Sequence, residues 1–585
     1  MTTDMKKIFI ALIVAAASLM FVGCESRLDI PRKGVVDLST FYQTDADAES
    51  ALVAAYYTAG RFFSNTMWTT AGWNDCPFLS MWEYASDEIY VAGSDKTDGQ
   101  SGNEIQAFRM DYNNSLITGT YECYYMVIKA CNDVLDNFAE AADTQVKKRC
   151  VAEARVLRAQ AQLLLALAWG TAPIVETNLP GDAKPENAES QAAVLQWVAD
   201  ECDKAIPDLT SKTSVNDKKG AVKVTKEFAY ALKGKALISK HDYAGAKTAL
   251  KQVIDSKLYA LVDGKDMASL NHHSGRATTE AVFELNFDWF SGMDSYGRTQ
   301  PNFRWLWSWR SDHMNSPTGE GTEFVPGGWG WVNPSQKFVD KILSYDGYDS
   351  YRRKAWIKSY DEVLYEMPYA TDFVVVGEGD DAKMVAKENW TLEDKMKDKN
   401  RGVYDSGLYG HVGYFMWKRL FRVEDRVLAD GNVANWNLTL MRYAEVLLLY
   451  AEACAQTGDD GSGLAALKLV NERAGSKTPV TACNMETVKS EKFLEGWLDG
   501  TRFQDLIRWG DAAKELADNG KYYPTFYDAM SKKGEAVHRG YIDESDANWC
   551  AKLYSVGFKA GKSELFPFPF NEMQLNPNLN QNPGY

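Results

Sequence analysis

The spacing of apolar residues constrains this chain most, because they recur every three or four positions over long segments. The period runs from residue 45 to 60 and again from 116 to 170. Residues that share one side of a helix in the second segment are Val151, Ala154, Leu157, Ala161, Leu164, Leu165 and Ala168. We therefore expect a mainly α-helical protein built from long amphipathic helices.

Residues 223–261 predict two helices joined by a tight turn. The spacing of their small residues gives the pattern of a tetratricopeptide-like helical hairpin, carried by Ala229, Ala236, Ala244, Ala249 and the closing Tyr259. Such a hairpin cannot bury its own apolar face, so it needs stacked neighbours. The helical segments 116–170, 188–207 and 439–475 are the expected neighbours in one scaffold.

Between about residues 270 and 435 the long amphipathic period disappears, and glycine, tryptophan, tyrosine and aspartate become frequent. Short stretches such as AVFELNFDW and DFVVVGE predict β-strands. We expect a helical N-terminal part (24–270), a loop-rich, tryptophan-rich insertion with short strands (271–435), and C-terminal helices with a proline-rich tail (436–585). Loops on a rigid scaffold are where binding sites usually lie.

The N-terminus has the layout of a secretory signal. Lys6 and Lys7 precede fifteen uncharged residues, Ile8–Val22, which are too few to cross a bilayer comfortably because an apolar helix needs about 20. Gly23 and Cys24 follow, so residues 1–23 predict a lipoprotein signal peptide whose cleavage leaves an acylated Cys24 as the membrane tether. An ordinary signal peptide cut near a chance cysteine is the alternative.

Charge and cysteine content exclude several classes of function. The formal net charge of −16 argues against a nucleic-acid partner, since phosphate binding needs a basic surface. Eight cysteines remain besides Cys24, without CxxC or zinc-like spacing, so we expect buried thiols in helix packing rather than a disulfide framework. They are Cys76, Cys123, Cys131, Cys150, Cys202, Cys454, Cys483 and Cys550.

Characteristic segments follow one another along the whole chain. ESRLDIP, YYMVIKACNDVLDN and AEARVLRAQAQLLLALAWGTAPIV come first, and LMRYAEVLLLYAEA, LVNERAG and SEKFLEGWLDGTRFQDLIRWGD precede the ending LFPFPFNEMQLNPNLNQNPGY. In this order they resemble the SusD/RagB family of nutrient-binding outer-membrane lipoproteins. Lys492, Asp499 and Phe568 stand where that family usually has Arg, Glu and Ile, and the first two replacements keep the charge.

The resemblance implies a tetratricopeptide-like α-superhelix, lipid-anchored through Cys24 on the outer face of the outer membrane. It further implies that the protein captures a glycan or oligosaccharide and passes it to a SusC-like TonB-dependent transporter, over which family members sit as a lid. It points to loops of the N-terminal part and the central insertion as the ligand platform. No cofactor is expected.

Six of the eighteen tryptophans fall between Trp289 and Trp331. In PNFRWLWSWR the rings of Phe303, Trp305, Trp307 and Trp309 alternate, so an extended chain would place them on one face about 7 Å apart, as a rail for sugar rings. Arg304 and Arg310 could donate hydrogen bonds to hydroxyls. Trp289, Trp329 and Trp331 complete this candidate set.

A second candidate set follows the first predicted helix and comprises Trp68, Trp73, Asn74, Trp82 and Asp87. We expect at least one residue of each set to contact the ligand; the alternative is that most of these tryptophans pack in the core or between loops.

Other functions remain as alternatives. Some relatives handle peptides, and a peptide binder should favour unpaired strand edges over an aromatic rail. A glycoside hydrolase needs two carboxylates about 5 to 9 Å apart across a cleft, and no catalytic motif of the common hydrolase classes is present, so no catalytic residues are predicted. A purely structural or adhesive surface protein would show no saturable ligand binding.

Charged residues near the end of the chain predict structure rather than chemistry. Arg442, Arg502 and Arg508 are expected to pair with acids such as Glu445, Glu452, Glu491 and Asp505 in a buried lattice between helices. The acidic turn GEGDDAK (377–383) lacks EF-hand spacing, so calcium there is a minor possibility, and His272 and His273 lack the context of a metal site.

Overall fold

The computed structural model describes residues 41–73, 75–91, 99–287, 303–309, 314–315, 328–359, 361–398, 402–403, 412–425, 436–521 and 555–585. The chain divides into two units, Met1–Asp47 and Ala48–Tyr585. None of the helices in the described ranges has the length and apolarity needed to cross a membrane.

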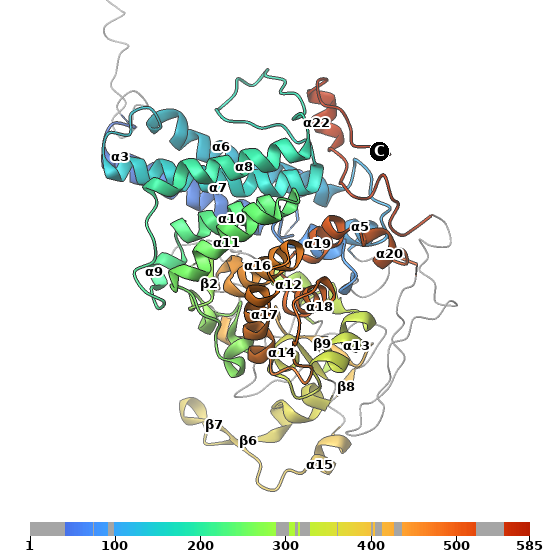
Figure 1. Cartoon of the computed structure of the whole chain (residues 1–585). Helices are drawn as coiled ribbons and strands as arrows, with labels where there is room; N and C mark the ends of the chain where they lie inside the picture. Colours follow the sequence, from blue (N-terminus) through green and yellow to red (C-terminus); the bar gives the residue numbers. More distant parts are fainter. Residues whose placement is uncertain are drawn as a thin grey trace, which may run out of the picture. The chain divides into compact units, whose positions relative to one another are not determined.

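A continuous stack of helices forms the scaffold, as the sequence predicts (Figure 1). Each helix packs against the next in the order α6, α7, α8, α10, α11, α16 and α17, with α18 against α16. Their bounds are α6 Ser115–Phe138, α7 Gln145–Trp169, α8 Gln191–Ala205, α10 Lys226–Ser239, α11 Tyr243–Ser256, α16 Tyr443–Thr457, α17 Asp460–Ala474 and α18 Met485–Glu495. The stack therefore joins α11 to α16 although 186 residues separate them in the chain.

Side-chain caps start the helices where the sequence predicts them. The hydroxyl of Thr225 accepts the N–H of Phe228 at 3.2 Å at the start of α10, and the Asp242 carboxylate accepts the N–H of Gly245 at 2.9 Å at the start of α11. Each cap satisfies a backbone donor that the first helical turn would leave without a partner. The predicted helical hairpin is confirmed.

One helix is buried on more faces than its amphipathic spacing indicates. On α7 the polar residues Arg158, Gln160 and Gln162 are buried along with the apolar ones. Arg158 donates to the carboxylate of Glu201 at 2.7 Å and to the side-chain oxygen of Asn132 at 2.7 Å. These bonds between neighbouring helices satisfy polar groups that burial would otherwise leave without partners.

Short strands close the remaining segments, and the described residues contain five two-stranded antiparallel sheets. The pairs are β1 (Ile89–Val91) with β4 (Val332–Pro334), β2 (Ala281–Leu285) with β10 (Leu438–Arg442), β3 (Met314–Asn315) with β8 (Gly402–Val403), β5 (Ile357–Ser359) with β9 (Tyr414–Met416), and β6 (Phe373–Val376) with β7 (Lys383–Ala386). The predicted strands in AVFELNFDW and DFVVVGE are β2 and β6. Because β2 pairs with β10, the two ends of the central insertion lie side by side where they join the helical scaffold.

The other helices are shorter, apart from α3. They are α3 (Asp45–Ser64), α4 (Ser80–Tyr84), α5 (Gln100–Gln106), α9 (Lys218–Ala221), α12 (Phe303–Trp307), α13 (Gln336–Tyr345), α14 (Tyr351–Trp356), α15 (Leu392–Lys397), α19 (Arg502–Trp509), α20 (Ala512–Glu515) and α22 (Phe570–Leu575).

Buried ion pairs join the C-terminal helices, which confirms the predicted lattice but changes some partners. Arg508 pairs with Glu452 and Asp505 at 2.7 Å each, as expected. Arg442 instead contacts three acids, Glu280, Glu495 and Asp499, at 2.6 to 2.9 Å, and Arg502 contacts Asp87 at 2.8 Å. Because both signs of charge are buried together, the lattice fixes how these helices meet.

The proline-rich tail packs on the scaffold, as predicted. The backbone N–H of Phe566 donates to the carbonyl of Ala168 at 2.8 Å, and the indole N–H of Trp169 donates to the carbonyl of Pro567 at 2.8 Å. Seven cysteines lie in the described ranges, and all are buried free thiols, as expected; Cys24 and Cys550 lie outside those ranges.

Candidate functional site

A tightly anchored loop after α3 carries two exposed tryptophans. The hydroxyl of Thr66 donates to the carbonyl of Trp73 at 2.6 Å, and the backbone N–H and hydroxyl of Thr70 donate to the Glu122 carboxylate on α6 at 2.9 and 2.6 Å. Gly119 allows this approach, since a Cβ there would lie 2.6 Å from Ala71. The scaffold therefore holds Trp68 and Trp73 in place while 38% and 43% of their surface stays exposed.

Three further tryptophans come from α12 and from the segment just before β4. The backbone N–H groups of Trp329 and Trp331 donate to the carbonyls of Trp305 and Leu306, both at 3.0 Å. The rings of Trp305 and Trp329 meet edge to face, with centroids 5.4 Å apart, and both are half-buried. The pairing of β4 with β1 brings this segment beside the N-terminal part of the chain.

The two predicted tryptophan sets meet at a stacked pair. The rings of Trp73 and Trp331 are nearly parallel, with an interplanar angle of 16° and centroids 6.2 Å apart, an offset stack. Trp331 is buried, and a Cβ at Gly99 (φ +68°) would lie 3.3 Å from its ring, so the backbone of Gly99 packs closely against Trp331. Trp331 thus supports one face of the Trp73 ring from the interior, and of the two rings Trp73 is the one exposed to solvent. We call Trp68, Trp73, Trp305, Trp329 and Trp331 the tryptophan cluster.

The predicted extended rail is wrong, because residues 303–307 form the helix α12. Phe303 and Trp307 therefore contact each other at helical spacing, with ring centroids 4.7 Å apart, instead of alternating along a strand. The indole N–H of Trp307 donates to the hydroxyl of Tyr84 at 3.0 Å, and that of Trp309 donates to the carbonyl of Met416 at 2.9 Å. Both rings are buried and offer no face to a ligand in this geometry.

Other predicted residues also lie in the interior. Trp82 is buried, with its indole nitrogen 3.4 Å from the hydroxyl of Tyr124. Asp87 is buried, and although burial raises its pKa, the guanidinium of Arg502 at 2.8 Å and Lys337 hold that pKa below the usual range. These contacts indicate a structural role. Asn74, Trp289 and Arg310 lie outside the described residues.

Two neighbours of the cluster carry no local signal in the sequence. Arg61, on α3, places its guanidinium 4.5 Å from the ring centroid of Trp68, and it forms no ion pair within the described ranges. Gly99 packs against Trp331 from a separate loop. Both contacts depend on how distant segments pack, so local patterns do not predict them.

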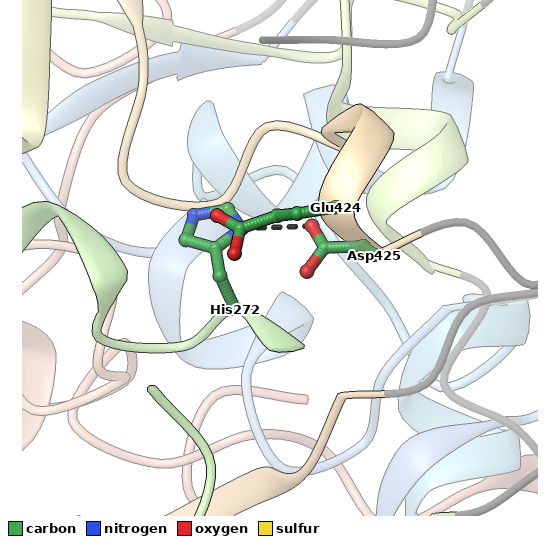
Figure 2. A group of neighbouring side chains, drawn as sticks. All are labelled: His272, Glu424 and Asp425. Carbon is green, nitrogen blue, oxygen red and sulfur yellow. Dashed lines mark hydrogen bonds and ion pairs between the residues drawn. The ribbon is translucent and has the colours of Figure 1, made fainter. Parts of the chain in front are cut away.

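His272, Glu424 and Asp425 lie next to one another, with His272 and Asp425 buried and Glu424 exposed (Figure 2). His272 places Nδ1 2.7 Å from Asp425 Oδ2 and Nε2 3.0 Å from the carbonyl of Lys418. The other Asp425 oxygen accepts the N–H of His273 at 2.7 Å, and Arg304 on α12 donates to Oδ2 at 3.2 Å. Burial raises the pKa of Asp425, yet His272 and Arg304 hold it at about 2.

Those three side chains could together offer ligands to a metal ion, since their ligand atoms lie within 4.8 Å of one another. The oxygens of Asp425 already accept several N–H groups, and the guanidinium of Arg304 adds positive charge beside them. A cation would have to displace these donors and would meet a like charge. The geometry therefore favours a structural clamp that positions α12 and Trp305.

A polar cleft of about 690 Å³ lies at the other end of the β1–β4 pair, beside Asp87, Tyr90, Lys337 and Glu515. Two lysines line this cleft and both are already paired, because Lys337 bridges Asp87 and Glu515 and Lys514 contacts Glu515 at 3.0 Å.

The SusD family profile matches residues 280–585. A SusD-like protein of Bacteroides ovatus is 22% identical over 617 residues, which cover 98% of this chain and 97% of the relative. Among solved structures, the surface glycan-binding protein A of Bacteroides thetaiotaomicron in complex with laminarihexaose matches with a TM-score of 0.68 at 20% identity, covering 92% of this chain and all of that one. The surface glycan-binding protein A of Bacteroides fluxus matches with a TM-score of 0.69 at 22% identity over 93% of this chain and 100% of the other. These likenesses confirm the SusD-like helical fold.

Proposed function

This chain belongs to the SusD family, and from that membership we propose that it is a surface lipoprotein that binds an oligosaccharide at the tryptophan cluster and passes it to a TonB-dependent transporter. The observation that carries the binding proposal is the stack of Trp73 on Trp331, which leaves Trp73 exposed.

The stack suits a sugar ring for a physical reason. The C–H groups on a sugar face pack against an aromatic plane, which removes apolar area from water without a charged partner. Trp73 is held by its backbone bond to Thr66 and by its contact with Trp331, so little side-chain entropy remains to be lost on binding. A preformed aromatic surface of this kind favours binding of a neutral ring.

Trp68 has a different place in the proposal. Its ring lies against the guanidinium of Arg61, which covers part of its surface. Arg61 forms no ion pair within the described ranges and has N–H groups that could donate to sugar hydroxyls. We therefore assign stacking to Trp73, support to Trp331, and hydrogen bonding to Arg61 beside Trp68.

Ligand identity is tested by isothermal titration of the purified soluble chain against a panel of oligosaccharides and peptides. Laminarihexaose is the first probe, because a structural relative was solved in complex with it. The proposal predicts saturable binding of at least one oligosaccharide and no turnover of it. Saturable binding of peptides alone would support the peptide-binding alternative, and release of shorter sugars would contradict a role in binding without chemistry.

Delivery to a transporter rests on the family resemblance and on the predicted lipid anchor at Cys24. Changing Cys24 to Ser should abolish retention at the outer membrane and nutrient uptake by cells, while the soluble chain still binds its ligand. Uptake that survives without the cysteine would contradict the tethered-lid proposal and leave the binding proposal intact.

A further inference from the structure

The hairpin of β6 and β7 exposes an unusual amount of apolar surface. The side chains of Val374, Val375 and Val376 are 44%, 68% and 55% exposed, and Val385 on β7 is 47% exposed. Val374 lies directly opposite Val385, and Val375 lies opposite Met384, so the valines occupy both faces of the hairpin. Figure 1 shows the hairpin and α15 at the end of the second unit away from α6, α7 and α8.

Within the described ranges, the outer edge of β6 carries backbone groups that no other strand pairs. The N–H of Lys387 donates to the carbonyl of Asp372 at 2.8 Å, which makes these two residues a hydrogen-bonded pair. Hydrogen-bonded and non-hydrogen-bonded pairs alternate along an antiparallel ladder, so Val374 and Val376 bond to β7. The N–H and C=O groups of Phe373 and Val375 therefore point outward, and within the described ranges β6 pairs only with β7.

The outer edges of β6 and β7 differ in how well their residues prevent pairing with another strand. Proteins usually guard a free strand edge with charged residues or proline. β7 begins with Lys383 and is followed by Lys387, whereas Phe373–Val376 contains neither a charge nor a proline. Exposed apolar side chains beside an unguarded edge are typical of an interaction surface.

Negative charge in the turn of the β6–β7 hairpin excludes some binding partners of the β6 edge. Exposed Glu378 and Asp381 lie in the turn between the strands, and the whole chain carries a formal charge of −16. An anionic lipid surface would repel this tip. Pairing with a second copy centred on Val375 would place Glu378 opposite Asp372 of the other copy, and like charges directly opposite destabilise a strand pair.

We propose that β6 is a docking edge for an extended segment of a second protein, one that carries β-branched residues along its length and a basic residue near the tip of the hairpin. The backbone of Phe373 and Val375 supplies the pairing, and the exposed valines supply apolar contacts. The site is built from an element that contributes nothing to the tryptophan cluster, so it is independent of glycan binding.

The test uses the purified chain and a short fluorescent peptide of alternating threonine and valine with lysine at both ends. A matched peptide with glutamate at both ends serves as the charge control. The lysine peptide should bind saturably and slow deuterium exchange of the amides of residues 373–376, and the glutamate peptide should bind about tenfold more weakly. Failure of the lysine peptide to bind, or equal affinity for both peptides, would overturn the proposal.

Two proline variants test whether the peptide binds to the outer edge of β6 or to that of β7. Val375→Pro removes an outward N–H without removing a bond to β7, and it should weaken peptide binding about tenfold or more. Ala386→Pro makes the same change on the outer edge of β7 and should leave peptide affinity unchanged. Circular dichroism and unchanged glycan binding verify that both variants are folded.

Two further measurements distinguish the rejected occupants. Sedimentation that shows concentration-dependent dimers lost in Val375→Pro would assign the edge to a second copy and overturn the proposal. Flotation with phosphatidylglycerol vesicles that is lost in Val375→Pro would assign it to a membrane and likewise overturn it.

Discussion

Replacing Arg442 with methionine should destabilise the protein strongly, because this guanidinium compensates two buried carboxylates, Glu280 and Glu495, and the half-buried carboxylate of Asp499. Arg442 is buried and contacts Glu280 and Asp499 at 2.6 Å and Glu495 at 2.9 Å. Removing one partner of a buried ion pair typically costs about 3 to 5 kcal/mol of unfolding free energy. Arg473 still contacts Glu280 and Glu495 in the variant, so we expect a cost near the lower end, about 3 kcal/mol.

Urea unfolding followed by tryptophan fluorescence at pH 7 measures this cost. The control is Lys129→Met, because Lys129 is 64% exposed and its pair with Asp133 spans 3.4 Å on the surface. An exposed pair contributes at most about 1 kcal/mol, and here we expect less than about 0.5 kcal/mol. Equal destabilisation by the two variants would refute the claim that the lattice holds the C-terminal helices.

The cost of Arg442→Met should also depend on pH. Burial raises the pKa of Glu495, but Arg473, Arg442 and Arg352 together hold it at about 2 in the folded protein. A lowered folded pKa contributes stability above the unfolded value of about 4.3, which is lost as pH falls toward 2. The difference between wild type and variant should therefore shrink from pH 7 to pH 3, and a constant difference would contradict this assignment.

Two further predictions concern the interior. Burial raises the pKa of Glu83 to about 7, so the stability that this carboxyl contributes is present below about pH 4.3 and is lost as pH rises through 7. In urea unfolding, Glu83→Gln should therefore stabilise the protein by roughly 2 kcal/mol at pH 8 and hardly at all at pH 4. No difference in stability at pH 8 would show that the pKa of Glu83 is not raised in the folded protein. Phe566→Ala should lower the free energy of unfolding by about 3 to 5 kcal/mol in thermal or urea unfolding, because the ring is fully buried against Trp82 and Trp169. The control Phe570→Ala, at a residue that is 41% exposed, should cost under about 1 kcal/mol. Equal costs for the two variants would show that packing of the tail does not stabilise the scaffold.

The helical scaffold could be predicted because the spacing of apolar residues and the capping residues of each helix lie within the helix's own short segment. The hairpin expected at 223–261 lies at Lys226–Ser239 and Tyr243–Ser256, where Thr225 and Asp242 provide caps within the same short segments. The lattice was predictable in kind but not in detail. Arg442 selects Glu280, Glu495 and Asp499, whose positions along the chain say nothing about their proximity.

The candidate site was less predictable, since it depends on contacts between distant segments. The aromatic residues of PNFRWLWSWR fit a helical turn as well as an alternating strand, and burial of Trp307 against Tyr84 favours the helix. Trp73 and Trp331 lie more than 250 residues apart in the sequence, and their contact depends on how distant segments pack, as the pairing of β1 with β4 also does.

Isothermal titration of Trp73→Ala with the oligosaccharide that wild type binds tests the central claim most directly. An aromatic stacking contact contributes up to about 1.5 kcal/mol, so the account predicts a Kd raised about tenfold, with the fold retained. The matched control is Tyr57→Ala, an exposed aromatic residue on α3 outside the cluster, which should leave the Kd unchanged. An unchanged Kd in Trp73→Ala would contradict the assignment of the tryptophan cluster as the binding site.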